Sequence, residues 1–331
     1  MPTYRRIVLA SRPSGVASLS NFRLEEAQTP VLQPGQMLVR NEWLSLDPYM
    51  RGRMNEGRSY AAAQALGEVM VGGTAGTVVE SRNPQFKVGD KVVAYLGWQE
   101  YGVSDGTGVY KVDTRVIPLS AYLGPVGMPG VTAWYGLKKI IEPKDGETIL
   151  VSAATGAVGS VVGQLAKLAG CRAVGIAGGA EKCSYAVVEL GFDACIDYKS
   201  QDVNRALKDA APQGVDGYFE NVGGAIMDAV LPRMNAFGRI ALCGLIAGYD
   251  SQPIPISNPS WFLVSRLMMQ GFIVTEHMEL WPQALKELGT QVATGGVKYR
   301  EAIATGLENA PQAFLGMLKG ANFGKQLVKL A

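Results

Sequence analysis

The feature that most constrains this chain is a short apolar run that ends in a glycine-rich turn and continues into a helical pattern. Residues Thr148–Ser152 predict a buried strand, and Ser160–Lys167 have the apolar spacing of an amphipathic helix. The turn between them has the form A-x-G-x-x-G, with Ala154 in place of the usual first glycine. In this pattern the second glycine lets the backbone approach a pyrophosphate, and the third lets the helix pack closely on the strand. The turn therefore predicts a dinucleotide site at a helix N-terminus. The expected contacts are Thr155, Gly156, Ala157, Val158 and Gly159.

The residues after the next apolar run indicate which dinucleotide binds. A site selective for NAD has an acidic residue about 20 positions after the turn, which binds the ribose 2′-hydroxyl. Here Gly178-Gly179-Ala180 occupy that place, and Lys182 follows. A site without the carboxylate and with a lysine accepts a 2′-phosphate, so we expect NADPH. Two alternatives stay open: small residues also serve plain helix–strand packing, and Lys182 could be an ordinary solvated lysine.

Strand and helix patterns alternate from Glu147 to about Val274, which predicts a doubly wound parallel sheet of the Rossmann type. The predicted strands are Thr148–Ser152, Arg172–Ala177, Ala194–Ile196, Gly217–Glu220, Ile240–Cys243 and Gly271–Val274. The run Trp261–Met269 has the spacing of an amphipathic helix. Before this region, short β-rich runs separated by Gly, Pro and Asp predict an irregular barrel or sandwich. We therefore expect an α/β protein with a β-rich domain over residues 1–125, completed by 296–331, and a nucleotide-binding domain over 126–295.

Composition excludes several classes of function. The 31 basic and 29 acidic residues give a net charge of +2, which indicates neither a nucleic acid nor an anionic membrane as partner. We expect a small apolar molecule instead. The sequence has no signal-peptide pattern and no span of about 20 apolar residues, so we expect a cytoplasmic protein.

The sequence has few residues that could bind a catalytic metal ion. The chain has one histidine, His277, and its four cysteines at 171, 183, 195 and 243 form no CxxC pair. A catalytic zinc needs several His, Cys or carboxylate ligands, so no metal is expected. We expect His277 to pack or cap near the last strand. Since no G-x-S-x-G elbow is present, the pattern favours hydride transfer from the cofactor over hydrolysis.

Segments spread over nearly the whole chain carry a resemblance to a known family. They are Leu46–Arg51, Met128–Ala133, Ala153–Gly159, Tyr218–Gly224, Phe237–Gly244 and Gly320–Lys325. In these the chain resembles the zinc-independent medium-chain reductases, which include prostaglandin and leukotriene reductases, plant alkenal double-bond reductases and bacterial curcumin reductases. The resemblance implies a GroES-like catalytic domain, a Rossmann domain and a homodimer. It also implies NADPH-linked reduction of enals, enones and 15-oxo-prostaglandin-like ketones.

The resemblance further implies roles for individual residues around the cofactor. Lys182 and Tyr198 would hold the adenosine 2′-phosphate side, and Asn221 would lie along the cofactor. The nicotinamide half would be lined by Cys243, Gly244, Leu245, Ile246 and Tyr249. The residues that would close over the nicotinamide are Phe272, Ile273, Val274 and Asn322. Met128 and Thr132 would lie near its carboxamide. Simpler roles stay open for three of them: Asn221 could cap its own turn, Tyr198 could be a surface aromatic, and Asn322 could serve only as a left-handed turn residue.

For catalysis we expect Tyr249, whose hydroxyl would donate to the substrate carbonyl oxygen, with Tyr49 as a second candidate that more closely fits a pocket wall. A surface position for Tyr249 is the competing interpretation. The loop Asp250–Pro255 departs from the family pattern, which leaves the substrate preference open. Two other functions compete: reduction of quinones, and NADPH binding without turnover as in the related lens crystallins.

Overall fold

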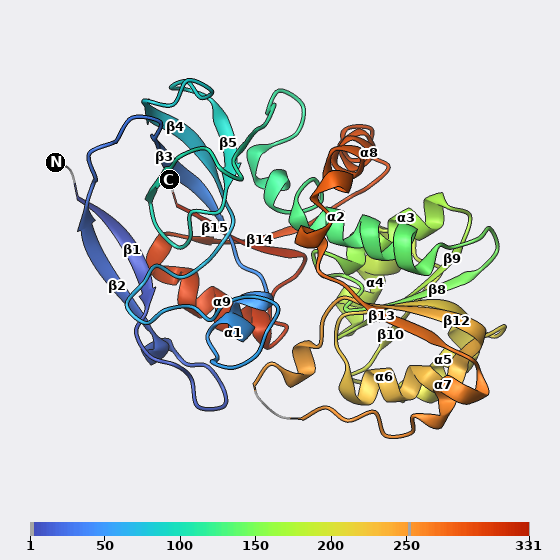
Figure 1. Ribbon diagram of the computed structural model, residues 1–331. Coiled ribbons are helices and arrows are strands. Elements are labelled where there is room, and N and C mark those ends of the chain that lie inside the picture. The colour runs from blue at the N-terminus through green and yellow to red at the C-terminus, as the bar shows by residue number, and fades with distance from the viewer. Residues whose placement is uncertain (1–2, 251–252, 331) are drawn as a thin grey trace. The chain divides into compact units, whose positions relative to one another are not determined.

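The computed structural model describes residues 3–250 and 253–330. The chain divides into two compact units, one of Met1–Leu123 with Glu301–Ala331 and one of Gly124–Arg300 (Figure 1). Each unit has its own sheet and its own buried apolar clusters. No helix within the described residues is long and apolar enough to cross a lipid bilayer.

The second unit is built on a six-stranded sheet in which all pairs are parallel. Its strands are β8 (Thr148–Ser152), β9 (Arg172–Ala177), β10 (Ala194–Asp197), β11 (Val215–Glu220), β12 (Met234–Leu242) and β13 (Met268–Gly271). Their order is β10-β9-β8-β11-β12-β13, the doubly wound order, so the predicted Rossmann sheet is confirmed. Every residue of β8 is buried, because helices cover both faces of such a sheet.

Two apolar clusters in this unit correspond to the two faces of the sheet. The α-helices described in this unit are α2 (Met128–Tyr135), α3 (Gly159–Leu168), α4 (Ala180–Val188), α5 (Val203–Ala210), α6 (Gly224–Val230), α7 (Ser260–Val264) and α8 (Trp281–Ala293), and a π-helical turn (Gly136–Ile141) follows α2. Helices α2, α3 and α8 pack in one cluster, and α5 and α6 pack in the other (Figure 1). Apolar residues recurring on one side of each helix therefore bury against the sheet.

The last strand and the helix before it differ from the sequence prediction. The predicted strand Gly271–Val274 is wrong, because β13 is Met268–Gly271 and a short 3₁₀ turn begins at Val274. The helix expected over Trp261–Met269 is wrong beyond Val264, where α7 ends. Arg266 has φ +48°, a left-handed conformation that stops a helix, and Met268 then pairs with Arg239 of β12. A short amphipathic run at a sheet edge fits both periodicities, which explains the error.

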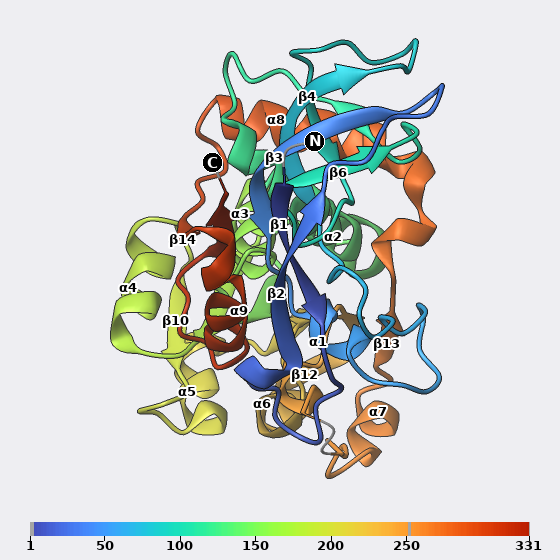
Figure 2. The same ribbon diagram turned by 90° about the vertical axis from the view of Figure 1, so that its left-hand side faces the viewer.

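The first unit contains a hairpin and a seven-stranded mixed sheet. The hairpin pairs β1 (Thr3–Leu9) with β2 (Phe22–Gln28) and faces the viewer in Figure 2. The sheet is formed by β3 (Met37–Ser45), β4 (Thr74–Ser81), β5 (Lys91–Ala94), β6 (Tyr101–Ser104), β7 (Tyr110–Lys111), β14 (Glu301–Thr305) and β15 (Lys325–Lys329). The α-helices among the described residues of this unit are α1 (Tyr49–Arg53) and α9 (Ala310–Leu318).

The C-terminal tail is an integral part of the first unit. Strand β15 pairs antiparallel with β3, so that Leu327 lies opposite Ser45. The Phe314 ring of α9 meets the fully buried Trp98 ring edge-on at 5.6 Å, and Phe22 stacks on Trp98 at 5.4 Å. Burial of these three large rings anchors the hairpin and the tail to the sheet.

Candidate functional site

The predicted cofactor residues of the second unit gather at one edge of its sheet, apart from Met128 and Thr132 in α2. The glycine turn follows β8, Lys182 lies just beyond β9, and Tyr198 follows β10. Asn221 follows β11, and the segments 243–249 and 272–274 follow β12 and β13. The strand order reverses between β8 and β11, and ligands of open α/β sheets bind outside the carboxyl ends of the strands at such a reversal. The topology thus brings residues far apart in sequence to one candidate site.

The glycine turn is shaped by close backbone contacts. Ala153, at φ +51°, turns the chain after β8, and the Gly156 N–H donates to the Ala153 carbonyl at 2.9 Å. A Cβ atom on Gly159 would lie 2.4 Å from that same carbonyl oxygen, closer than any side chain allows, whereas one on Gly156 would lie 3.2 Å away. Glycine is therefore required where α3 begins. A tight turn that leads into the first N–H groups of a helix fits a pyrophosphate.

A fully buried carboxylate, Glu220, links the two strands at the reversal, and the sequence analysis missed it. Its Oε1 accepts hydrogen bonds from the Ser152 hydroxyl at 2.7 Å and the Gly223 N–H at 3.0 Å. The Val222 N–H and the Tyr218 hydroxyl also donate to it. Four donors compensate the cost of burying the charge. The available signal was a glutamate that directly ends an apolar strand before Asn-Val-Gly-Gly.

Asn221 bridges β11 and β8. Its side-chain amide donates to the Ser152 carbonyl at 2.8 Å, and its backbone N–H donates to the Ser152 hydroxyl at 2.8 Å. The N–H groups of its own turn go to Glu220 instead. The amide of Asn221 thus joins the ends of two neighbouring strands, and its contact with the cofactor stays a prediction.

Tyr249 folds back over the loop that follows β12. A Cβ atom on Gly244 would lie 3.5 Å from the Tyr249 hydroxyl and 3.5 Å from the Asn221 carbonyl oxygen. The Tyr249 hydroxyl and the Asn221 carbonyl therefore both lie next to Gly244, at ordinary contact distance. Ile254 packs against Gly223 and Gly248, which places part of the loop after Tyr249, while Ser251 and Gln252 lie outside the described residues.

Two lysines and a tyrosine gather where β9 and β10 end. A Cβ atom on Gly178 would lie 2.9 Å from the Tyr198 hydroxyl and 3.0 Å from Cε of Lys199. Burial and the charge of Lys199 both lower the pKa of Lys182. Lys199 is a further candidate that the sequence analysis missed, although its position beside Tyr198 was visible. A bound phosphate dianion would compensate the repulsion between the two ammonium groups.

Asp197 fixes the shape of this end of the sheet. Its carboxylate accepts from the Gly179 N–H at 2.7 Å, the Lys199 N–H at 3.0 Å and the Ser200 hydroxyl at 2.7 Å. These hydrogen bonds lower its pKa. The carboxylate thus connects the loop before α4 to the end of β10.

Three further candidates, Phe272, Val274 and Thr132, contact other residues of the second unit. The Phe272 ring packs on Tyr135 at 5.4 Å and edge-on to Phe219 at 6.2 Å, and the Val274 carbonyl accepts from the Trp281 indole at 3.1 Å. The Thr132 hydroxyl donates to the Met128 carbonyl at 2.8 Å.

His277 lies beside the same aromatic group. Its ring stacks on Tyr135 at 4.5 Å, and its Nε2 shares a hydrogen bond of 2.8 Å with the Tyr135 hydroxyl. The prediction that His277 packs near the last strand is confirmed.

In the first unit, Tyr49 belongs to a group of tyrosines. Its hydroxyl shares a hydrogen bond with the Tyr95 hydroxyl, and the two rings lie 6.5 Å apart at 25°. Burial raises the pKa of Tyr49 well above its usual value, with additions from Tyr95, Asp47 and Tyr60, and burial raises the pKa of Tyr95 to about 12. The hydroxyls of Tyr49 and Tyr95 are therefore protonated at neutral pH. Tyr60 and Tyr95 were missed because no local pattern brings them to Tyr49.

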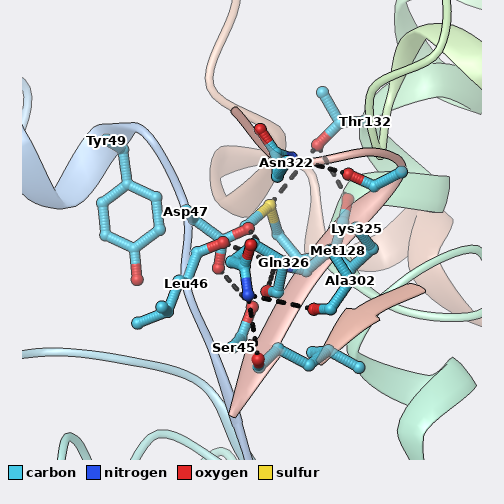
Figure 3. A network of polar contacts seen from close by, with 12 residues as sticks. Ser45, Leu46, Asp47, Tyr49, Met128, Thr132, Ala302, Asn322, Lys325 and Gln326 are labelled. Atoms are coloured by element: carbon cyan, nitrogen blue, oxygen red, sulfur yellow. Dashed lines mark hydrogen bonds and ion pairs between the residues drawn. The ribbon is translucent and has the colours of Figure 1, made fainter. Parts of the chain in front are cut away.

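A buried ion pair supports the turn that carries Tyr49. Lys325 donates to Asp47 at 3.0 Å and to the carbonyls of Leu46 at 2.6 Å and Gln326 at 3.0 Å (Figure 3). The Ser45 hydroxyl also donates a hydrogen bond to the Asp47 carboxylate. This pair joins the turn after β3 to β15, so the tail of the chain holds Tyr49 in place.

Asn322 lies in the loop before β15. Its amide donates to the Gly324 carbonyl at 2.8 Å. The left-handed positions of this loop are Gly320 at φ +71° and Gly324 at φ +80°. The alternative that Asn322 serves as a left-handed turn residue is therefore wrong.

Comparisons with known proteins match both units. The family described as the N-terminal domain of oxidoreductase matches residues 5–112, and the family described as zinc-binding dehydrogenase matches residues 157–290. Within residues 3–250 and 253–330, however, no three His, Cys, Asp or Glu side chains lie close enough together to hold a metal ion.

Characterised relatives are similar over nearly the full length. The chain is 47% identical to the NADPH-dependent curcumin reductase of Escherichia coli, over 99% of this chain and 97% of the relative. It is 45% identical to prostaglandin reductase 1 of Rattus norvegicus, over 95% of each chain. It is 41% identical to the NADP(+)-dependent 2-alkenal reductase of Nicotiana tabacum, over 99% of this chain and 97% of the relative.

A solved structure agrees with these relatives. The structure of CurA from Vibrio vulnificus in complex with NADPH superposes with a TM-score of 0.94, at 46% identity over 99% of both chains. The chain therefore belongs to the zinc-independent medium-chain reductase family that includes the curcumin, prostaglandin and 2-alkenal reductases.

Proposed function

We propose that this protein reduces the carbon–carbon double bond of α,β-unsaturated aldehydes and ketones with NADPH. The observation that carries the proposal is the lysine pair Lys182 and Lys199 beside a glycine turn at the reversal point of the sheet, which suits a dinucleotide with a 2′-phosphate. The relatives named for curcumin, prostaglandin and 2-alkenal support the substrate class.

The gathering of the candidate residues at the strand ends supports a location for the cofactor. Residues 155–159 would hold the pyrophosphate, and Lys182, Tyr198 and Lys199 would hold the 2′-phosphate. Residues 243–246, Tyr249 and Asn221 would line the nicotinamide half, together with residues 272–274, Met128 and Thr132. Asn322 belongs to the first unit, and its role at the nicotinamide stays a prediction from the family resemblance. NADPH, when bound, supplies the hydride that the β carbon of the substrate accepts.

Tyr249 would stabilise the charge that develops on the substrate. As the β carbon gains a hydride, negative charge moves to the carbonyl oxygen, and a phenol that donates to this oxygen lowers the barrier. The α carbon then takes a proton from this hydroxyl or from water. Tyr49, the second candidate, has a raised pKa that keeps its hydroxyl protonated at neutral pH.

The proposal is tested against quinone reduction and against binding without turnover. The purified protein is mixed with NADPH and, in separate reactions, with a 2-alkenal, a benzalacetone-type enone and a quinone. Oxidation of NADPH that depends on the enone and yields the saturated carbonyl supports the proposal. Activity on the quinone alone, or cofactor binding with no oxidation, contradicts it.

We also propose that the protein is a cytoplasmic homodimer. Strand β13 forms an edge of the described sheet, and Leu263 and Met268 near it are 79% and 48% exposed. An edge strand beside exposed apolar side chains is a surface that a second copy can cover. The four free cysteines suit a reducing compartment. Light scattering of the purified protein tests the dimer, and cell fractionation tests the location.

A further inference from the structure

Two cysteines of the second unit lie side by side. The sulfur atoms of Cys183 and Cys195 are 3.1 Å apart, and both residues are partly exposed. Cys183 lies in the first turn of α4, and Cys195 lies in β10. Because the sulfurs of a disulfide are separated by about 2.05 Å, an approach of about 1 Å would join them.

The surroundings distinguish the two sulfurs. Cys195 lies opposite Gly175 of β9, where a Cβ atom would be 3.2 Å from its sulfur, so glycine leaves the space that Cys195 occupies. Burial raises the pKa of both thiols, and hydrogen bonds from Cys195 and from the Ala177 backbone offset this only in part for Cys183. Because the Cys195 thiol donates its hydrogen bond to the Cys183 sulfur, Cys183 is assigned as the sulfur that reacts first and Cys195 as the thiol that closes the disulfide.

We propose that Cys183 and Cys195 are a reversible disulfide site that controls the affinity for NADPH. With a peroxide as oxidant, the Cys183 sulfur attacks one oxygen, the O–O bond breaks, and a sulfenic acid and water form after proton transfer. The Cys195 sulfur then attacks the sulfenic sulfur, the S–O bond breaks, and a second water leaves. In total two thiols are oxidised to a disulfide while hydrogen peroxide is reduced to two waters.

The position of the pair connects the bond to the cofactor. Lys182 precedes Cys183, while Tyr198 and Lys199 follow Cys195 closely. The Asp197 carboxylate already ties the two elements together through the Gly179 N–H. Drawing the sulfurs together moves the first turn of α4 toward β10 and displaces Lys182 from its place beside Lys199. This consequence rests on the proposed NADPH site, whereas formation of the bond does not.

The first experiment counts thiols. The reduced full-length protein has four cysteines, so after hydrogen peroxide treatment and denaturation we expect two titratable thiols, a loss of two hydrogens in intact mass, and full recovery with dithiothreitol. Cys171→Ser, which keeps the pair, should show the same two-hydrogen loss. Cys183→Ser and Cys195→Ser should not, and the alanine variants repeat the test if a serine variant does not fold. Four thiols retained in the wild type, or an equal two-hydrogen loss in Cys183→Ser, overturns the site.

The second experiment measures cofactor affinity. NADPH and NADH are titrated by fluorescence into the reduced, oxidised and re-reduced protein. We expect oxidation to raise the Kd for NADPH about fivefold, with little change for NADH, because a charge-assisted contact to the phosphate is weakened. If the oxidised protein has an unchanged Kd for NADPH, or if oxidation weakens NADPH and NADH binding equally, the proposal that the disulfide controls NADPH affinity is overturned. Enone reduction is assayed separately on the reduced protein, so its failure is distinguishable from failure of this proposal.

Discussion

Lys199 lies close enough to Lys182 for its positive charge to lower the pKa of Lys182. Lys182 is half-buried and Lys199 is exposed, and an anion bound between the two ammonium groups would lower their mutual repulsion. No carboxylate takes the usual ribose position, because Asp197, the nearby candidate, is occupied by the N–H groups of Gly179 and Lys199. The 2′-phosphate of NADPH is the anion that this arrangement suits.

Replacement of either lysine should therefore change cofactor selectivity. We expect Lys182→Ala and Lys199→Ala each to raise the Kd for NADPH about 10-fold or more, with little effect on NADH, since a charge-assisted hydrogen bond contributes about 1.5–3 kcal/mol. Fluorescence titration with both cofactors measures this. Lys208→Ala, an exposed position on α5, is the matched control. Equal losses for NADPH and NADH would show that the lysines only support the fold.

Glu220 should be important for stability. In Glu220→Gln one carboxylate oxygen becomes an NH₂ group, which faces either the Gly223 N–H at the Oε1 position or the Tyr218 hydroxyl at the Oε2 position. We expect a loss of about 2–4 kcal/mol in the free energy of unfolding, measured by urea denaturation, and weaker NADPH binding. The control Glu189→Gln removes only an exposed ion pair with Lys298 and should cost less than about 1 kcal/mol. Equal midpoints for the two variants would contradict the role of Glu220.

Tyr249 should affect turnover more than cofactor binding. Tyr249→Phe keeps the ring beside Gly244 but removes the hydroxyl, so we expect kcat for enone reduction to fall about 10- to 1000-fold with the Kd for NADPH nearly unchanged. Tyr4→Phe, which removes a hydroxyl hydrogen bond to Gln99, is the control and should keep its rate. A wild-type kcat in Tyr249→Phe would assign the role to another donor.

Glu287 makes stability depend on pH. Burial raises its pKa, but hydrogen bonds from Lys138, Trp134 and Gln283 outweigh this and lower the pKa from 4.5 to about 2. A carboxylate with a lowered pKa stabilises the folded protein above pH 4.5, and this contribution disappears as the pH falls toward 2.

The variant Glu287→Gln tests this dependence. Because the Glu287 side chain is 36% exposed, we expect a stability loss of only about 1 kcal/mol at pH 7, shrinking steadily below pH 4.5. Thermal denaturation of both proteins at several pH values measures the difference. A difference that grows as the pH falls would contradict the assignment.

The sheet of the second unit was predictable where its strands are buried on both faces. Strands β8 and β9 begin and end where their continuous apolar runs do. Strand β13 was misplaced because it lies at the edge, where Met268 is exposed and the apolar pattern is shared between a strand and a helix. Only the pairing with β12 decides between them.

Part of the site also depends on contacts that no local pattern carries. The glycine turn and Lys182 stood out because their spacing follows the cofactor. Three other residues did not stand out, because only the fold brings each one close to its partner. These pairs are Lys199 with Lys182, Glu220 with Ser152, and Tyr95 with Tyr49. The same holds for Lys325, whose buried partner Asp47 is distant in sequence.

The most direct test of the proposed function is the rate of NADPH oxidation by the purified, reduced protein with a 2-alkenal or an enone, followed by analysis of the product. We predict oxidation that requires the unsaturated carbonyl, prefers NADPH to NADH and yields the saturated aldehyde or ketone. No oxidation with either substrate, or formation of the unsaturated alcohol in place of the saturated carbonyl, would contradict the account.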